Sequence, residues 1–193
     1  MSVDRSTCPV IGVVSSAGGL DALTRVLEVL PAGLPASVIA LQHADPSRRS
    51  RLSDVLDRVG PLPVSDAEDG SPLRPGEVLV APSGFHTLIA HDRTVALVRS
   101  GRYPPSRPSA DLLLATLAMA VGADAIAVVL TGFGHDGAAG ATAIKRMGGT
   151  LLASTVATSQ EPAMPEAAID TGQVDRIVPL DEVGAVLVEL VTT

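Results

Sequence analysis

Short apolar runs rich in valine and isoleucine alternate along this chain with segments in which leucine and valine recur at helical spacing. The runs predict buried strands at 9–14, 37–42, 63–65, 77–80, 125–130, 150–154 and 176–178. The other segments predict helices at 20–30, 47–59, 110–121, 165–170 and 181–191, and one that ends at 147. Because strands joined through helices pair in parallel, we predict an α/β fold: a doubly wound, mostly parallel sheet with helices on both faces.

The middle of the chain departs from this alternation. Two apolar runs, 87–90 and 94–99, are separated by a short polar turn and predict an inserted antiparallel β-hairpin. The preceding segment, 60–84, is rich in proline and glycine, but the strands predicted within it place it inside the domain. We therefore expect one domain over residues 10–193, after an irregular leader of residues 1–9.

Composition narrows the classes of function. Aromatic residues are 2% of the chain and apolar residues 46%, so the core must be aliphatic, which suits helices packed on a parallel sheet. The formal net charge of −7 argues against a nucleic-acid partner, because phosphate binding needs a basic surface. The single cysteine, Cys8, excludes an internal disulfide and a zinc site of clustered cysteines. No signal peptide or membrane span is visible, so a cytoplasmic location is expected.

Reactive side chains follow three of the predicted strands. Ser15 and Ser16 end the first strand, His43 follows the second, and Asp136 lies in the turn after the strand at 125–130. The carboxyl ends of parallel strands share one sheet edge, so these groups are expected to meet there as the parts of a hydrolytic triad. Each also has a plainer interpretation: Ser16 and Asp136 as helix caps, and His43 as a partly buried polar residue.

A phosphate-binding turn is the rival interpretation of the segment "GVVSSAGG", since a small-residue turn between a strand and a helix presents backbone N–H groups. The segment matches neither the dinucleotide fingerprint nor the P-loop, and no lysine occurs before Lys145. It also lacks the first glycine of a G-x-S-x-G elbow, because Val14 stands there. The serine must therefore be argued from its context.

Six segments, in this order and spacing, resemble the catalytic domain of the chemotaxis-type protein-glutamate methylesterases. They are "IGVVSSAGGLDAL", "LQH", "VLVAPSGFH", "RPSADLLL", "VVLTGFGHDGAAG" and "AMPEAAI". The resemblance spans about residues 10–191. It implies a serine hydrolase that demethylates γ-glutamyl methyl esters on chemoreceptor helices and releases methanol; some members of the family also deamidate glutamines. The implied partners are the cytoplasmic helices of methylated chemoreceptors, with no nucleic acid and no insertion into the membrane.

The resemblance also implies a role for particular residues. Ser16 matches the family's nucleophile, His43 its base and Asp136 its acid, whereas Ser15 is taken as structural. The backbone N–H groups of Ala17 and Phe133 match the positions that hold the oxyanion, where donors act on charge that develops in the transition state. No cofactor and no metal are implied.

Three departures from the family pattern bear on function. Ala17 stands where the family usually has threonine, and Phe133 where it usually has methionine, which is expected to narrow the pocket. The family usually carries a phosphorylatable receiver domain before the catalytic one, which needs about 100 residues. Only nine residues precede Val10, so a methylesterase without a receiver, insensitive to phosphoryl donors, is expected.

Two other classes of function stay open from the sequence. A catalytically silent receptor-binding module would have the same fold without a working triad. A nucleotide-binding α/β protein would use the small-residue turn for phosphate.

Overall fold

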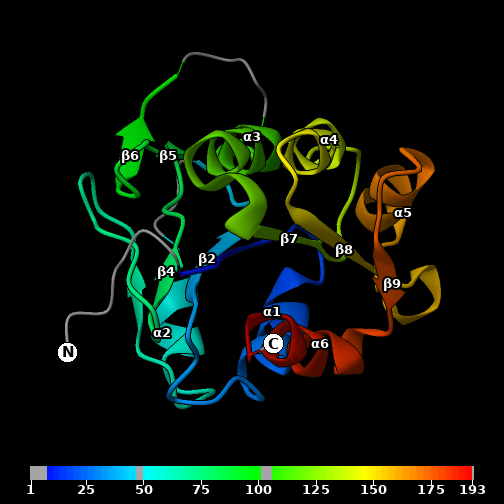
Figure 1. Cartoon of the computed structure of the whole chain (residues 1–193), viewed down its shortest axis with the longest axis horizontal. Helices are drawn as coiled ribbons and strands as arrows, with labels where there is room; N and C mark the ends of the chain where they lie inside the picture. The colour runs from blue at the N-terminus through cyan, green and yellow to red at the C-terminus, as the bar shows by residue number, and fades with distance from the viewer. Residues whose placement is uncertain (1–7, 47–49, 101–105, 193) are drawn as a thin grey trace.

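The computed structural model describes residues 8–46, 50–100 and 106–192, so most of the predicted leader lies outside the described residues. A sheet of seven strands runs through the centre of the molecule (Figure 1). Its strands lie in the order β3 Val64–Asp66, β4 Val78–Val80, β2 Ser37–Gln42, β1 Val10–Ser15, β7 Ala125–Val129, β8 Thr150–Ser154 and β9 Arg176–Val178. All neighbouring strands pair in parallel, which confirms the predicted sheet.

Helices cover both faces of this sheet (Figure 1). One face carries α1 Gly19–Leu27, α2 Leu52–Leu56 and α6 Leu180–Thr192, and the other carries α3 Ala110–Val121, α4 Ala138–Arg146 and α5 Ala163–Asp170. The side chains of β1 alternate between the two layers: Val10 and Val14 join the core under α3, and Ile11 and Val13 join the core under α1. A strand buried on both sides must be apolar at successive positions, which explains why β1 lacks the alternation of a half-exposed strand.

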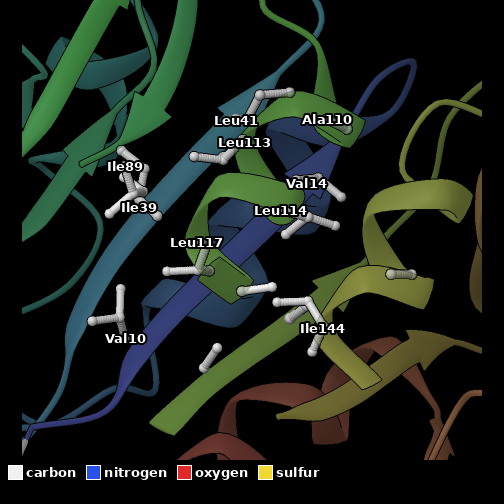
Figure 2. Packing of buried hydrophobic residues seen from close by; sticks show 14 of the residues in the cluster. Val10, Val14, Ile39, Leu41, Ile89, Ala110, Leu113, Leu114, Leu117 and Ile144 are labelled. Carbon is white, nitrogen blue, oxygen red and sulfur yellow. The ribbon is translucent and has the colours of Figure 1, made fainter. Parts of the chain in front are cut away.

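Helix α3 packs most directly over the centre of the sheet (Figure 2). Leu113, Leu114 and Leu117 are fully buried in the cluster that also holds Val14 of β1 and Ile144 of α4. Because α3 is clamped by this apolar contact, its first turn is held in a fixed place above the carboxyl edge of the sheet.

The predicted hairpin is confirmed as a separate two-stranded antiparallel sheet of β5 His86–Ile89 and β6 Val95–Val98. It lies beside α3, where the backbone N–H of Ile89 donates to Thr116 Oγ1 at 3.0 Å. The hairpin therefore extends the layer of α3 rather than the main sheet.

Helix α2 is shorter than predicted. The sequence predicts a helix over 47–59, of which 47–49 lie outside the described residues, but the structure has only Leu52–Leu56. Only two large apolar side chains, Leu52 and Leu56, are buried along it, and Asp57 turns away from the helix to accept the backbone N–H of Val64 at 2.8 Å. One buried turn is too little apolar contact to hold a longer helix.

The order of the strands creates a switch point at the centre of the sheet. The chain leaves β1 toward β2 on one side and later returns to β7 on the other side. Ligand sites of open α/β sheets lie at such a point, outside the carboxyl ends of the strands. In the described part of the chain, no helix is both long and apolar enough to cross a membrane.

Candidate active site

The turn after β1 separates two adjacent serines. Ser15 is fully buried, and its hydroxyl donates to the carbonyl of Leu41 at 3.2 Å, so it serves the core. Ser16 is half-buried, and its hydroxyl makes no hydrogen bond to any described residue. Ser16 is not the cap of α1: that position belongs to Gly18, at a φ of 77°, a left-handed conformation that suits glycine. The cap interpretation of Ser16 is therefore wrong.

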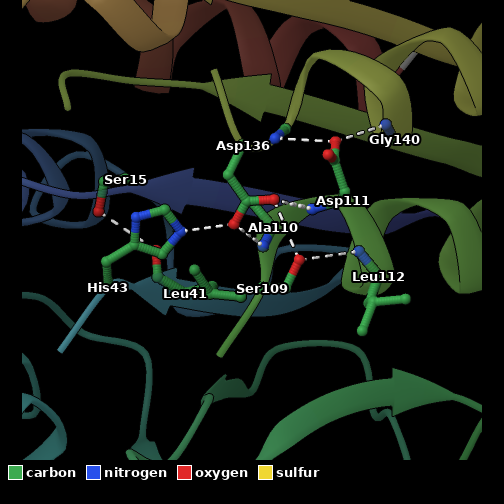
Figure 3. A network of polar contacts seen from close by, with 10 residues as sticks. Ser15, Leu41, His43, Ser109, Ala110, Asp111, Leu112, Asp136 and Gly140 are labelled. Atoms are coloured by element: carbon green, nitrogen blue, oxygen red, sulfur yellow. Dashed lines mark hydrogen bonds and ion pairs between the residues drawn. The ribbon is translucent and has the colours of Figure 1, made fainter. Parts of the chain in front are cut away.

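His43 and Asp136 meet across 93 positions of sequence. His43 Nε2 lies 2.7 Å from Asp136 Oδ2, and the two side chains are 15% and 18% exposed (Figure 3). Because a carboxylate only accepts, the network assigns the proton to Nε2 and leaves Nδ1, on the far side of the ring, as the acceptor. The backbone N–H of His43 donates to the carbonyl of Ser15 at 3.0 Å, which ties the histidine to the end of β1.

Asp136 caps a helix, but not the one that follows it. Its carboxylate accepts four hydrogen bonds: His43 Nε2 at 2.7 Å, Ala110 N at 2.8 Å, Asp111 N at 2.9 Å and Ser109 Oγ at 3.0 Å (Figure 3). The two backbone donors belong to the first turn of α3, where an anion also meets the positive end of the helix dipole. The interpretation of Asp136 as an ordinary cap of its own helix is therefore wrong.

The pKa of Asp136 reflects these contacts. Burial is the largest single influence and favours the neutral acid. The hydrogen bonds from His43 and from the backbone N–H groups of Asp111 and Ala110 together outweigh it, and they lower the pKa of Asp136 from 3.8 to about 2. The carboxylate is therefore charged at neutral pH and can hold the ring of His43 in one tautomer.

Asp111, in the first turn of α3, caps the neighbouring helix α4. The sequence analysis did not single it out. Its Oδ1 accepts the backbone N–H groups of Gly137 and Gly140, each at 2.8 Å, at the start of α4 (Figure 3). Burial, together with the nearby charge of Asp136, raises the pKa of Asp111 despite these two bonds. Helices α3 and α4 thus cap each other through two acids. The sequence signal that could have indicated Asp111 was an acid in the first turn of α3, two residues after Ser109. Ser109 itself caps α3, as predicted.

The turn after β7 packs directly on Ser16. Gly132 allows this approach, because a side chain there would place its Cβ 2.6 Å from Ser16 Cβ and 3.0 Å from Ser16 N. The backbone N–H groups of Ala17 and Phe133 make no hydrogen bond to the residues that the structure describes. Two free backbone donors therefore flank the serine.

Phe133, which is expected to narrow the pocket, lines a cavity of the structure. Its side chain is 62% exposed and lines an open cavity of about 490 Å³ next to Asp136. The remaining lining comes from Ser106, Ser109, Asp111, Leu112, Gly134 and His135. Ser16 and His43 are not among the residues that line this cavity.

The structure brings His43 and Asp136 together and places Ser16 at the same sheet edge, but it shows no hydrogen bond between Ser16 and His43 within the described ranges. Nucleophile-to-base bonds are commonly longer without substrate and shorten in the complex. The arrangement can support acyl transfer: a free hydroxyl, an oriented imidazole and free N–H donors at one edge of the sheet.

Comparisons with known proteins show the family of this chain. The family model described as "CheB methylesterase" matches residues 11–187. A protein-glutamate methylesterase/protein-glutamine glutaminase of Myxococcus xanthus is 39% identical over 94% of this chain and 53% of its own length. One from Moorella thermoacetica is 37% identical over 97% of this chain and 45% of its own length. The chain thus spans about half the length of the curated relatives that it matches.

A solved structure supports the same likeness. The crystal structure of the Thermotoga maritima CheB methylesterase catalytic domain superposes with a TM-score of 0.91 at 33% identity. The match covers 96% of this chain and 100% of that chain.

Proposed function

This chain belongs to the CheB methylesterase family, and from that premise we propose that it hydrolyses γ-glutamyl methyl esters on chemoreceptor-like proteins to glutamate and methanol. The same site would hydrolyse a glutamine side chain to glutamate and ammonia, in line with the second activity in the relatives' names. The proposed substrates are the cytoplasmic helices of such receptors, which places the reaction in the cytoplasm.

The observation that carries this proposal is the contact of 2.7 Å between His43 Nε2 and Asp136 Oδ2, beside a serine hydroxyl without a partner among the described residues. In the proposed triad, Asp136 holds the ring of His43 so that Nδ1 serves as the base. Ser16 Oγ is then the nucleophile, because the hydroxyl of Ser15 is buried and donates to the carbonyl of Leu41.

Acylation proceeds through one tetrahedral intermediate. Ser16 Oγ attacks the ester carbonyl carbon while its proton passes to His43 Nδ1, and the carbonyl electron pair moves onto oxygen. The pair returns as the bond to the methoxy oxygen breaks, and His43 gives its proton to that oxygen, so methanol leaves. Asp136, charged at neutral pH, stabilises the imidazolium during the transfer.

The N–H groups of Ala17 and Phe133 are the proposed donors to the oxyanion. Neither has a hydrogen-bond partner in the described parts of the chain, and they flank Ser16 from two different turns. Both donors are backbone groups, so alanine at position 17 keeps its donor where the family usually has threonine.

Deacylation repeats the sequence with water in place of serine. His43 Nδ1 takes a proton from water, the hydroxide attacks the acyl carbon, and Ser16 Oγ leaves with the proton that His43 returns. The receptor glutamate is released and the site is restored. With a glutamine substrate, the leaving group of the first stage is ammonia.

The test is methanol release by the purified chain from a chemoreceptor cytoplasmic domain that carries radiolabelled methyl esters. The wild-type chain is expected to release label and Ser16→Ala to release it only at a small residual rate, because the acyl intermediate cannot form. Ser15→Ala, which removes only a buried core hydroxyl, is expected to keep the activity. Full activity of Ser16→Ala would show that another residue is the nucleophile. If the wild-type chain bound the receptor without releasing methanol, a catalytically silent binding module would be favoured.

A further inference from the structure

We propose that Thr131 is a positioning residue for this reaction: it fixes the nucleophile and both oxyanion donors relative to one another without touching substrate. The inference rests on the proposed function of the same site. Thr131 lies two residues after the end of β7 and is only 3% exposed, so its side chain is closed off from any substrate.

Thr131 holds the nucleophile turn at two points. Its backbone carbonyl accepts the N–H of Ser16 at 2.9 Å, and its hydroxyl lies 3.0 Å from the carbonyl of Ala17, to which it can donate. Between these two anchors lie the Cα of Ser16, which carries the nucleophile, and the N–H of Ala17, which is the first oxyanion donor. Thr131 thus holds both ends of the segment that carries these groups, while Gln42 Nε2 and the N–H of Gly19 donate to the Ser16 carbonyl between them at 3.3 and 2.9 Å.

The hydroxyl of Thr131 also contacts the segment around Glu161. It accepts the backbone N–H of Glu161 at 2.8 Å and lies 3.2 Å from the carbonyl of Glu161. That carbonyl accepts the N–H of Gly132 at 2.8 Å, and the carbonyl of Gly132 accepts the N–H of Met164 at 2.9 Å. The segment around Glu161 therefore supports the turn that presents the N–H of Phe133, the second donor.

The hydroxyl of Thr131 acts both as a hydrogen-bond donor and as an acceptor. Its single proton serves the carbonyl of Ala17 or that of Glu161, and its lone pair serves the N–H of Glu161. Valine has nearly the same shape but can do neither, so Thr131→Val removes the ties while it fills the same space. Of its bonds to residue 131, the nucleophile turn then keeps only the backbone bond from the N–H of Ser16.

The loss is expected in the chemical step. Oxyanion donors act only when they point at the developing charge, and removal of one donor typically costs about 10²–10³ in rate. Displaced rather than deleted donors predict a fall in kcat of roughly 10- to 100-fold for Thr131→Val. KM is expected to stay within about twofold, because a residue without exposed surface contributes nothing to uniform substrate binding.

Matched variants separate this role from mere stability. Thr131→Ser keeps the hydroxyl and loses the methyl, so it is expected to restore kcat to near the wild-type value. Thr87→Val is the control, because Thr87 is also fully buried, and its hydroxyl has no partner among the described residues. It is expected to leave kcat and KM unchanged.

The experiment measures kcat and KM for methanol release from the methylated receptor domain, with thermal unfolding of each variant to confirm that it is folded at the assay temperature. A folded Thr131→Val with wild-type kcat, or a Thr131→Ser as slow as Thr131→Val, overturns the inference. If Thr131→Val does not fold, Thr131→Ala takes its place, and equal kcat values for the alanine and serine variants overturn it. A wild-type chain that releases no methanol refutes the proposed function instead.

Discussion

Asp136→Asn tests how one side chain serves both a helix and a reaction. All four contacts of the Asp136 carboxylate are donors: two N–H groups of α3, the hydroxyl of Ser109 and Nε2 of His43. An asparagine must turn its NH₂ group toward two of these donors. If the NH₂ group faces Ala110 and His43, the ring of His43 must place its proton on Nδ1, and the base toward Ser16 is lost.

The expected cost to activity follows from that tautomer. A triad with the acid changed to its amide and the geometry kept loses on the order of 10⁴ in kcat, because the histidine is held in the wrong form. We expect a similar loss here, measured as methanol release per active site. If kcat of Asp136→Asn stayed within about tenfold of wild type, the charged carboxylate of Asp136 would not support His43 in the reaction, whichever way the amide is turned.

The same variant makes a second, independent prediction about stability. The pKa of Asp136 is lowered to about 2 in the folded chain, so its ionised form stabilises the fold. This shift of the pKa corresponds to a contribution of about 2 kcal/mol to the free energy of unfolding. This stability is fully present above a pH of about 4 and is lost as the pH falls through the folded pKa of about 2. Urea unfolding of wild type between these pH values should show the loss, and Asp136→Asn should show less of it. Identical pH profiles would refute the assigned pKa.

Two further predictions concern the neighbours of this acid. Asp111→Ala should lower the free energy of unfolding by about 2 kcal/mol, because two N–H groups of α4 lose their acceptor. Asp111→Asn keeps Oδ1 for both bonds and removes a buried acid with a raised pKa, so urea unfolding at neutral pH should find it at least as stable as wild type; a loss equal to that of the alanine variant would contradict this. His43→Ala combined with Ser16→Ala should release methanol no more slowly than Ser16→Ala alone, because triad members act as a unit; a further loss beyond about tenfold would show that the two act separately.

Much of the fold was predictable because it is encoded segment by segment. The apolar runs of β1, β2, β7 and β8 are buried on both faces, and such strands carry their signal in their own residues. Helix α3, which is apolar along most of its length, was predicted at its observed bounds, whereas the helix predicted at 20–30 ends at Leu27. The bounds of α2 were predicted wrongly. Its pattern of polar residues indicated a longer helix, but its two buried leucines hold only one turn.

The candidate residues were also visible in the sequence, but only as ends of strands and as positions that match a family motif. Ser16, His43 and Asp136 were expected at one edge because parallel strands end together. Their assignment as a triad remains a proposal, supported by the contact between His43 and Asp136.

Tertiary structure alone decided how these residues are held. Strand order sets β1 between β2 and β7, and so decides which strand ends are neighbours. Asp136 caps α3 across 26 positions and contacts His43 across 93, while the carbonyl of Ala17 finds the hydroxyl of Thr131 across 114. Periodicity and capping preferences act over a few residues, so they cannot reveal a partner that only the packing of helices on the sheet brings near.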